Sequence, residues 1–290
     1  MKIRKVFILI IFVLFFCSYS YSQDYHWLQY LTSDNSMWID WTDYKIYSEI
    51  DVKCNEFIDK DIIIKNRRII LLNKIYNTIL NINLDKEHKV KDLLHKKSAI
   101  QIWDELNDND VLSLIKLDKN YYKIILECKL TPSILQNMIT QQYLLSTPKS
   151  IHPKQVSMDF LSSYSGVLIE VNTDKFFPFF YVYLYTSDGK LFFSPSLIEY
   201  DTFLQNGMAL YLTEKNKELI KKRAGKNPLI LQANSIFDGI KNSLKLTEHS
   251  SFYLNFKRVI ELIKKGKLVI LKKKYSPMQK ESINEFELNE

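Results

Sequence analysis

The stretch FFYVYLYT (179–186), followed by SDG (187–189) and LFF (191–193), decides the fold class predicted for this chain. Along the first segment apolar residues alternate with tyrosines, so the two sets lie on opposite faces of a β-strand. The Ser-Asp-Gly triplet has the composition of a tight turn, which predicts two antiparallel strands. The alternating tyrosines are Tyr181, Tyr183 and Tyr185.

These three tyrosines are the candidate binding residues of the chain. If helices cover only the aliphatic face of the strand, the rings form an exposed ladder that can stack on sugars or pack against a partner protein. The alternative is that helices or neighbouring strands bury the rings. A second aromatic set, Trp27, Trp38 and Trp41, either forms another binding site or covers a hydrophobic core.

Further strands and helices are predicted on both sides of this segment. Strand patterns occupy 166–171, 208–212, 228–233 and 268–271. Charged or amphipathic helices are expected at 214–223 and 252–265, each followed by a glycine that ends it. Together these patterns predict a mixed β-sheet with flanking helices.

The N-terminal part is expected to be mainly helical. Apolar residues recur at helical spacing in 66–82, and shorter helices are predicted from Ser98 to Leu106 and from Thr131 to Leu145. The run Tyr121–Cys128 fits either a helix or a strand. The predicted fold class is therefore α+β, with a mainly helical N-terminal part followed by a mixed β-sheet with flanking helices.

Four regions follow from these patterns. They are a signal peptide (1–22), a mainly helical region (23–150), an α+β region (151–274) and a polar tail (275–290). A linker is predicted at Ser146–Gln155, where two prolines lie among polar residues. No repeat of fixed period is present.

The first 22 residues have the layout of a secretory signal peptide. Three basic residues precede the apolar run Val6–Cys17, and a short polar segment follows it. Ser20 and Ser22 are the small residues before a predicted cleavage at Gln23. The mature protein is therefore expected to be secreted or periplasmic and to keep no stable membrane span.

Two other interpretations of this segment stay open. An uncleaved anchor needs an apolar core of about 20 residues, longer than the one present. Lipid attachment at Cys17 needs small residues before the cysteine, whereas Phe15 and Phe16 occupy those positions. Cleavage and release fits the sequence better than either.

Composition and charge narrow the function classes. The chain is 46% hydrophobic and 25% charged, which is typical of a globular protein. Removing the three basic residues of the signal peptide lowers the formal net charge from +7 to +4. Basic residues are concentrated in 214–274, but Lys also serves as a solubilising residue. We expect no nucleic-acid partner, because an exported protein seldom meets one.

The sequence contains no recognisable catalytic, metal or cofactor site. Three Ser-x-x-Lys matches occur at 113–116, 146–149 and 187–190, but a Ser-Asp-Asn triplet precedes them all and no Lys-Thr-Gly follows. The five histidines are scattered, and an acidic cluster at 104–110 lacks the glycine of a calcium loop. We predict no catalytic residues, no metal ligands and no cofactor.

Two cysteines, Cys54 and Cys128, remain after removal of the signal peptide. In an oxidising compartment they either form one disulfide or stay free. The leading interpretation of the whole chain is a non-enzymatic exported protein that binds a protein or glycan partner. The alternative is an exported hydrolase whose catalytic residues converge only in three dimensions.

Overall fold

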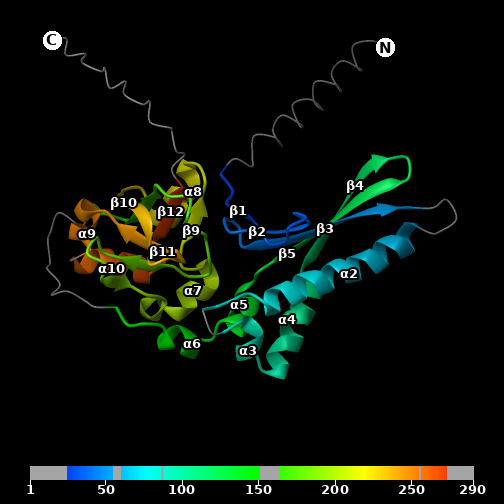
Figure 1. Cartoon of the computed structure of the whole chain (residues 1–290), viewed down its shortest axis with the longest axis horizontal. Helices are drawn as coiled ribbons and strands as arrows, with labels where there is room; N and C mark the ends of the chain where they lie inside the picture. Colours follow the sequence, from blue (N-terminus) through cyan, green and yellow to red (C-terminus); the bar gives the residue numbers. More distant parts are fainter. Residues whose placement is uncertain (1–24, 55–59, 86–87, 151–162, 255, 273–290) are drawn as a thin grey trace, which may run out of the picture.

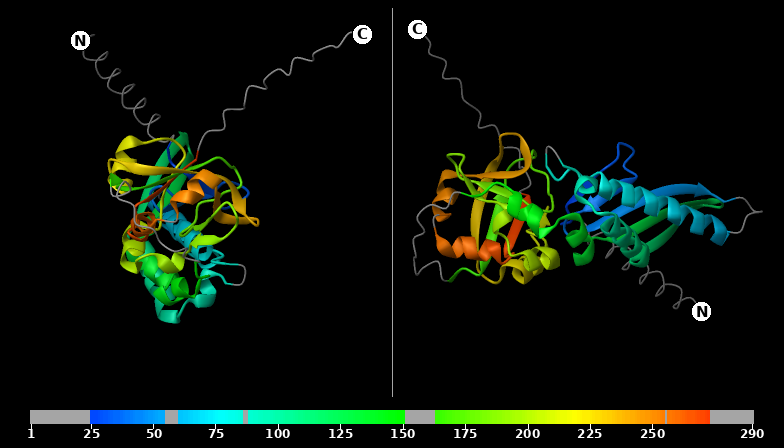
Figure 2. Two further views of the ribbon diagram at one scale, coloured as in Figure 1. Left: turned by 90° about the vertical axis from the view of Figure 1, so that its left-hand side faces the viewer. Right: turned by 90° about the horizontal axis from the view of Figure 1, so that it is seen from below.

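The computed structural model describes residues 25–54, 60–85, 88–150, 163–254 and 256–272. The chain forms a mixed α/β structure built on two β-sheets, one from each half of the sequence. Figures 1 and 2 show each sheet with its helices at opposite ends of the long axis of the molecule.

The first sheet is antiparallel throughout, with strand order β1-β2-β3-β5-β4. Its centre is the long pairing of β3 with β5, in which Ile46 lies opposite Cys128 and Lys53 opposite Tyr121. The strands are β1 (Leu28–Tyr30), β2 (Met37–Asp40), β3 (Lys45–Lys53), β4 (Asp110–Asp118) and β5 (Tyr121–Lys129).

Helices cover one face of this sheet. Ile46 and Leu126 point toward the helices and are buried, whereas Tyr47 and Glu127 lie on the opposite, open face. α2 crosses β3 and β5, and α4 lies beside α2 through the contact of Tyr76 with Trp103. The helices of this half are α2 (Lys60–Leu80), α3 (Val90–Leu93), α4 (Lys96–Asp108), α5 (Pro132–Met138) and α6 (Gln141–Ser146).

The second sheet is mixed, with strand order β8-β7-β11-β10-β6-β12-β9. β10, β6, β12 and β9 run parallel, while the β10–β11 and β7–β8 pairs are antiparallel. The strands are β6 (Gly166–Val171), β7 (Tyr183–Tyr185), β8 (Leu191–Phe193), β9 (Leu210–Leu212), β10 (Pro228–Phe237), β11 (Ile240–Leu246) and β12 (Leu268–Lys272).

Both faces of this sheet are covered, which explains why its central strands are continuous apolar runs. Leu168 and Val269 pack with Ile220 of α8 on one face, whereas Val167 and Ile270 join the core with Ile263 of α10 on the other. The helices of this half are η2 (Pro195–Leu197), α7 (Tyr200–Asn206), α8 (Lys217–Ala224), α9 (Glu248–Tyr253) and α10 (Lys257–Lys264).

The two sheets meet through buried contacts. Thr42 accepts a hydrogen bond from the Trp27 N–H (2.9 Å) and donates one to the Tyr211 carbonyl (2.7 Å). A Cβ added at Gly207, where φ is 65°, would lie 2.2 Å from the Tyr44 hydroxyl. Glycine is therefore required for this close approach.

The predicted fold class is wrong for the N-terminal part. Three strands, β1 to β3, come first, and the helices of the described residues are spread along the whole chain. The pattern of β3 was misleading because Ser48 occupies a buried position that an apolar residue usually fills. Its partner β5 begins at Tyr121, 68 residues after Lys53 at the end of β3, so no local signal revealed the pairing.

Several individual elements were predicted well. Strands 166–171 and 191–193 match β6 and β8, and Tyr121–Cys128 is a strand rather than a helix. Thr131 caps α5 by accepting the Ile134 N–H, as its Thr-Pro sequence predicts. The helix predicted at 252–265 is instead divided between α9 and α10.

Some predictions lie outside the described residues. These are the signal peptide with its cleavage residues Ser20, Ser22 and Gln23, the second half of the linker (151–155), and the tail 275–290. Within the described part of the chain, no helix combines the length and the apolar character needed to cross a membrane.

Candidate functional site

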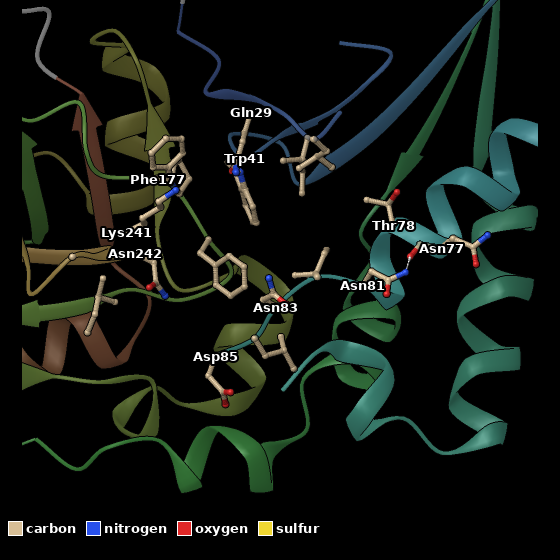
Figure 3. Close-up of a pocket in the computed structure, with 18 of the residues that line it drawn as sticks. Gln29, Trp41, Asn77, Thr78, Asn81, Asn83, Asp85, Phe177, Lys241 and Asn242 are labelled. Atoms are coloured by element: carbon tan, nitrogen blue, oxygen red, sulfur yellow. Dashed lines mark hydrogen bonds between the residues drawn. The ribbon is translucent and has the colours of Figure 1, made fainter. Parts of the chain in front are cut away.

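A pocket of about 1010 Å³ lies where the two sheets meet (Figure 3). It is at the upper end of the range of about 300–1,000 Å³ typical of ligand sites. Its walls come from β1 and β2, the last turns of α2 and the loop after it, the segment before β7, and the β10–β11 turn. The polar and aromatic side chains labelled in Figure 3 include Gln29, Trp41, Asn77, Asn81, Asn83, Phe177 and Asn242.

The wall from the first sheet is organised by one hydrogen bond. The Trp41 indole N–H donates to Gln29 Oε1 at 2.7 Å. An indole nitrogen can only donate, so the Gln29 oxygen must be the acceptor and the amide NH₂ is left to donate elsewhere. Trp41 itself is buried against Phe180, with ring centroids 5.1 Å apart.

Asparagines from the end of α2 form the opposite wall. Asn77 and Asn81 are four residues apart, so they share one face of the helix. The Asn81 side chain donates back to the Asn77 carbonyl at 2.8 Å. The side-chain amides of Asn77 and Asn83 are hydrogen-bonded to none of the described residues, and each offers a donor and an acceptor to the pocket.

The second sheet contributes aromatic rings and a tight turn. Phe179 lies 5.9 Å from Trp41 between ring centroids, and Phe177 is partly exposed. Asp238 and Gly239 both have positive φ values, 47° and 71°, as a two-residue hairpin turn requires. This turn brings Lys241 over the Phe177 ring, with Nζ 5.1 Å from its centroid.

Three of the four charged side chains that line the pocket are engaged by the protein. Lys74 donates to Ser36, and Lys241 lies over an aromatic ring. Asp85 accepts from the Tyr143 hydroxyl at 2.9 Å. The fourth, Asp238, is exposed in the hairpin turn. The rest of the lining consists mainly of neutral amides, aromatic rings and aliphatic side chains.

A His–Asp cluster, which the sequence did not predict, lies near the junction of the sheets. Among the described residues, the ligand atoms of His26, Asp40 and Asp43 lie within 4.8 Å of one another. Asp40 Oδ2 is 2.6 Å from His26 Nδ1, and Oδ1 accepts the Thr42 N–H at 2.9 Å. Because both oxygens of Asp40 are engaged by the protein, we assign the cluster a structural part as an ion pair.

The predicted tyrosine ladder is not exposed. Only Tyr183–Tyr185 is a strand, and Tyr181 and Tyr185 are 1% and 8% exposed. Tyr181 donates its hydroxyl to the Leu84 carbonyl, and Tyr185 stacks on Phe237 with ring centroids 3.8 Å apart. Burial raises the pKa of the half-buried Tyr183 to about 12. Neighbouring segments cover the rings, so the ladder is part of the core.

Of the two states that the sequence left open for Cys54 and Cys128, the structure has the free cysteines and no disulfide between them. Both cysteines are free, and Cys128 lies opposite Ile46, at the other end of β3 from Cys54. Eight residues of extended strand span roughly 26 Å, whereas a disulfide needs Cα atoms within about 7 Å. Burial raises the pKa of the Cys128 thiol to about 12.

The three tryptophans separate into two environments. Trp27 and Trp41 are buried in the core at the junction, and Trp41 also lines the pocket. Trp38 lies on the open face of the first sheet, where its ring stacks on Tyr47 with centroids 5.2 Å apart. Tyr30 follows on the next strand, 6.3 Å from Trp38.

Sequence reasoning missed the amides of the pocket. Gln29, Asn77 and Asn83 come from separate elements, and only the fold brings them together. The one available signal was the spacing of Asn77 and Asn81, which places two amides on one helix face. Asparagine is common throughout this chain, so that signal did not stand out.

Residues 166–274 match the family model of the second domain of Treponema pallidum Tp0624. The match covers fewer than half of the residues but contains every strand of the seven-stranded sheet. No curated protein matches the chain. The pocket therefore combines Phe177 and Lys241, inside the similar region, with Gln29 and Asn77 outside it.

Proposed function

We propose that this chain is an exported, non-enzymatic binding protein that holds a neutral glycan in the pocket between its two sheets. The observation that carries the proposal is the convergence of amide side chains with aromatic rings in one cavity. Amides donate and accept at once, which matches the paired hydroxyl groups of a sugar. Ring faces match the apolar C–H face of the same sugar.

The charge of the pocket supports a neutral ligand. Lys74 and Asp85 are already bonded to Ser36 and Tyr143, so an ionic ligand would compete with these partners. The amides of Asn77 and Asn83 face no such competition from described residues. A ligand that hydrogen-bonds without charge therefore fits the pocket best.

The test is a calorimetric titration of the mature chain with neutral oligosaccharides of increasing length, with an acidic oligosaccharide for comparison. We expect saturable binding of a neutral member and weaker binding of the acidic one. Asn77→Ala should weaken that affinity about fivefold to tenfold, as the loss of one hydrogen bond worth about 1 kcal/mol predicts. Absence of binding across the neutral panel would contradict the proposal.

Asn73→Ala is the matched control. Asn73 is exposed on the same helix, one turn before Asn77, and does not line the pocket. Its replacement carries the same loss of an amide and the same change in helix propensity. We expect wild-type affinity for this variant, so an equal loss in both variants would argue against binding in the pocket.

The alternative function, an exported hydrolase, predicts turnover rather than binding. After prolonged incubation, mass spectrometry of the oligosaccharides distinguishes the two. Intact ligand supports the binding protein, and shortened products support the hydrolase.

The proposal of export rests on the first 22 residues. Mass spectrometry of the protein recovered outside the cytoplasm tests the export: we expect a chain that begins at Gln23.

A further inference from the structure

The five-stranded sheet ends in a long strand with one unpaired edge. β4 pairs with β5, and none of the other described strands lies on its outer side. Its outer edge therefore presents main-chain N–H and C=O groups that can pair with another chain. Figure 1 shows the β4–β5 hairpin (green) projecting away from the seven-stranded sheet.

Apolar side chains are exposed on both faces of β4. Leu114, on the helix-covered face, is 37% exposed, and Ile115, on the open face, is 46% exposed. Proteins usually protect such an edge with proline, several charges or a bulge. The irregularity of β4 falls between Lys116 and Asp118, so the segment 110–116 is a regular strand.

We propose that β4 binds β4 of a second copy of this chain, edge to edge and antiparallel, so that one sheet continues across the dimer. The charges of β4 favour a second copy of the same strand as its partner. Lys116 is exposed and forms no ion pair with the described residues, while Asp110 lies six residues before it on the same face. A two-fold axis at Ser113 places each Lys116 opposite Asp110 of the other copy.

With the axis at Ser113, apolar residues of the two copies also lie opposite each other. Val111 lies opposite Ile115 of the second copy on the open face, and Leu112 lies opposite Leu114 on the other face. Cross-strand apolar and opposite-charge pairs of this kind stabilise antiparallel sheets. Moving the axis to Leu114 would instead place Asp110 opposite Asp118, and like charges directly opposite are destabilising.

Asp110 is already held by Arg68, and its side chain is only 9% exposed. Arg68 Nε lies 2.7 Å from Asp110 Oδ2, and Nη2 donates to Oδ1 at 2.9 Å. The lysine of the second copy therefore meets only the exposed edge of this carboxylate, and the apolar cross-strand pairs make the larger part of the proposed contact. The arginine also fixes the carboxylate at the start of the strand, where the register needs it.

Sedimentation velocity of the mature chain over a wide concentration range tests the dimer. We expect a concentration-dependent dimer that Lys116→Asp weakens about tenfold or more, because two opposite-charge pairs become like-charge pairs. Lys119→Asp, in the β4–β5 turn beyond the paired segment, makes the same charge change and should leave the dimer intact. A chain that stays monomeric at all concentrations would overturn the proposal.

A cysteine at the axis tests the register independently of Lys116. In a Cys54→Ser background, Ser113→Cys places two thiols opposite each other, with Cα atoms about 4.5–5.5 Å apart, within disulfide range. We expect this variant to form a covalent dimer on mild oxidation and Lys119→Cys in the same background to stay monomeric under denaturing conditions. Equal cross-linking of both variants, or none with Ser113→Cys, would overturn the proposed pairing.

Discussion

The Trp41 indole N–H donates to Gln29 Oε1 at 2.7 Å, from the end of one strand to its neighbour, and this bond orients the Gln29 amide at the pocket. Because Trp41 is buried against Phe180 and Tyr211, the position of the amide is tied to the core at the junction of the two sheets. The buried indole of Trp41 thus holds the Gln29 amide in place at the pocket.

The first prediction concerns this amide. Gln29→Glu keeps an oxygen for the Trp41 N–H but replaces the free NH₂ donor with a carboxylate oxygen. We expect an unchanged melting temperature and an affinity for the neutral glycan reduced about tenfold, the loss of one donated hydrogen bond. Gln136→Glu, on the exposed side of α5, is the matched control for charge. If Gln29→Glu binds as tightly as the control, the amide does not contact the ligand.

The second prediction concerns the buried tyrosine. The Tyr181 hydroxyl donates to the Leu84 carbonyl, which connects the segment before β7 to the loop after α2. Tyr181→Phe leaves that buried carbonyl without its donor, at a cost of about 1–3 kcal/mol of unfolding free energy. Tyr183→Phe removes a hydroxyl that bonds none of the described residues and should cost much less. Urea denaturation measures both, and equal losses would argue against the Tyr181 bond.

The third prediction is a pH dependence of stability. The hydrogen bond to Asp40 raises the pKa of His26 above its usual 6.5, and it outweighs the opposing effect of burial. A raised pKa in the folded state means that the stabilisation is complete below pH 6.5 and is lost as the pH rises through the folded pKa. We expect His26→Gln to destabilise the protein at pH 6 and to have a smaller effect at pH 8.

His249→Gln controls for this pH dependence, because His249 is exposed on α9, away from the His26–Asp40 pair. This variant should cost less unfolding free energy than His26→Gln at pH 6, because none of the described carboxylates pairs with the His249 ring. Thermal unfolding at the two pH values measures the difference. A His26→Gln effect that grows with pH would contradict the assignment.

The fourth prediction concerns the cysteines. The native chain, purified without reductant, should contain two free thiols. Cys54 is partly exposed and should react with a thiol reagent in the folded protein, whereas Cys128 is buried, with its pKa raised to about 12, and should react only after unfolding. A chain without titratable thiols in denaturant would contradict the strand pairing that separates them.

The C-terminal half was easier to predict than the N-terminal half for a physical reason. Gly166–Val171 is buried on both faces, so its composition alone indicates a strand. β3 carries charges on its open face and Ser48 on its buried face, and its pairing with β5 closes a long loop. Local patterns contain no trace of such a pairing.

The candidate site could not be predicted because its parts are separate in sequence. Tyr181, Tyr183 and Tyr185 drew attention through their alternation, yet adjoining segments bury the first and last of them. In the sequence alone, Gln29 and Asn83 cannot be distinguished from ordinary polar surface residues. Whether their side-chain amides are free to donate depends on the hydrogen bonds that they already form within the protein, and only the fold determines these bonds.

The most direct test of the proposed glycan binding is a nuclear magnetic resonance titration of the mature chain with the tightest-binding neutral oligosaccharide. We expect the side-chain amide signals of Gln29, Asn77 and Asn83 and the indole signal of Trp41 to shift in one saturable process. The signals of Asn73 and Trp38, which lie outside the pocket, should stay in place. Shifts confined to Trp38 and its surroundings, with none at the three amides, would contradict the account.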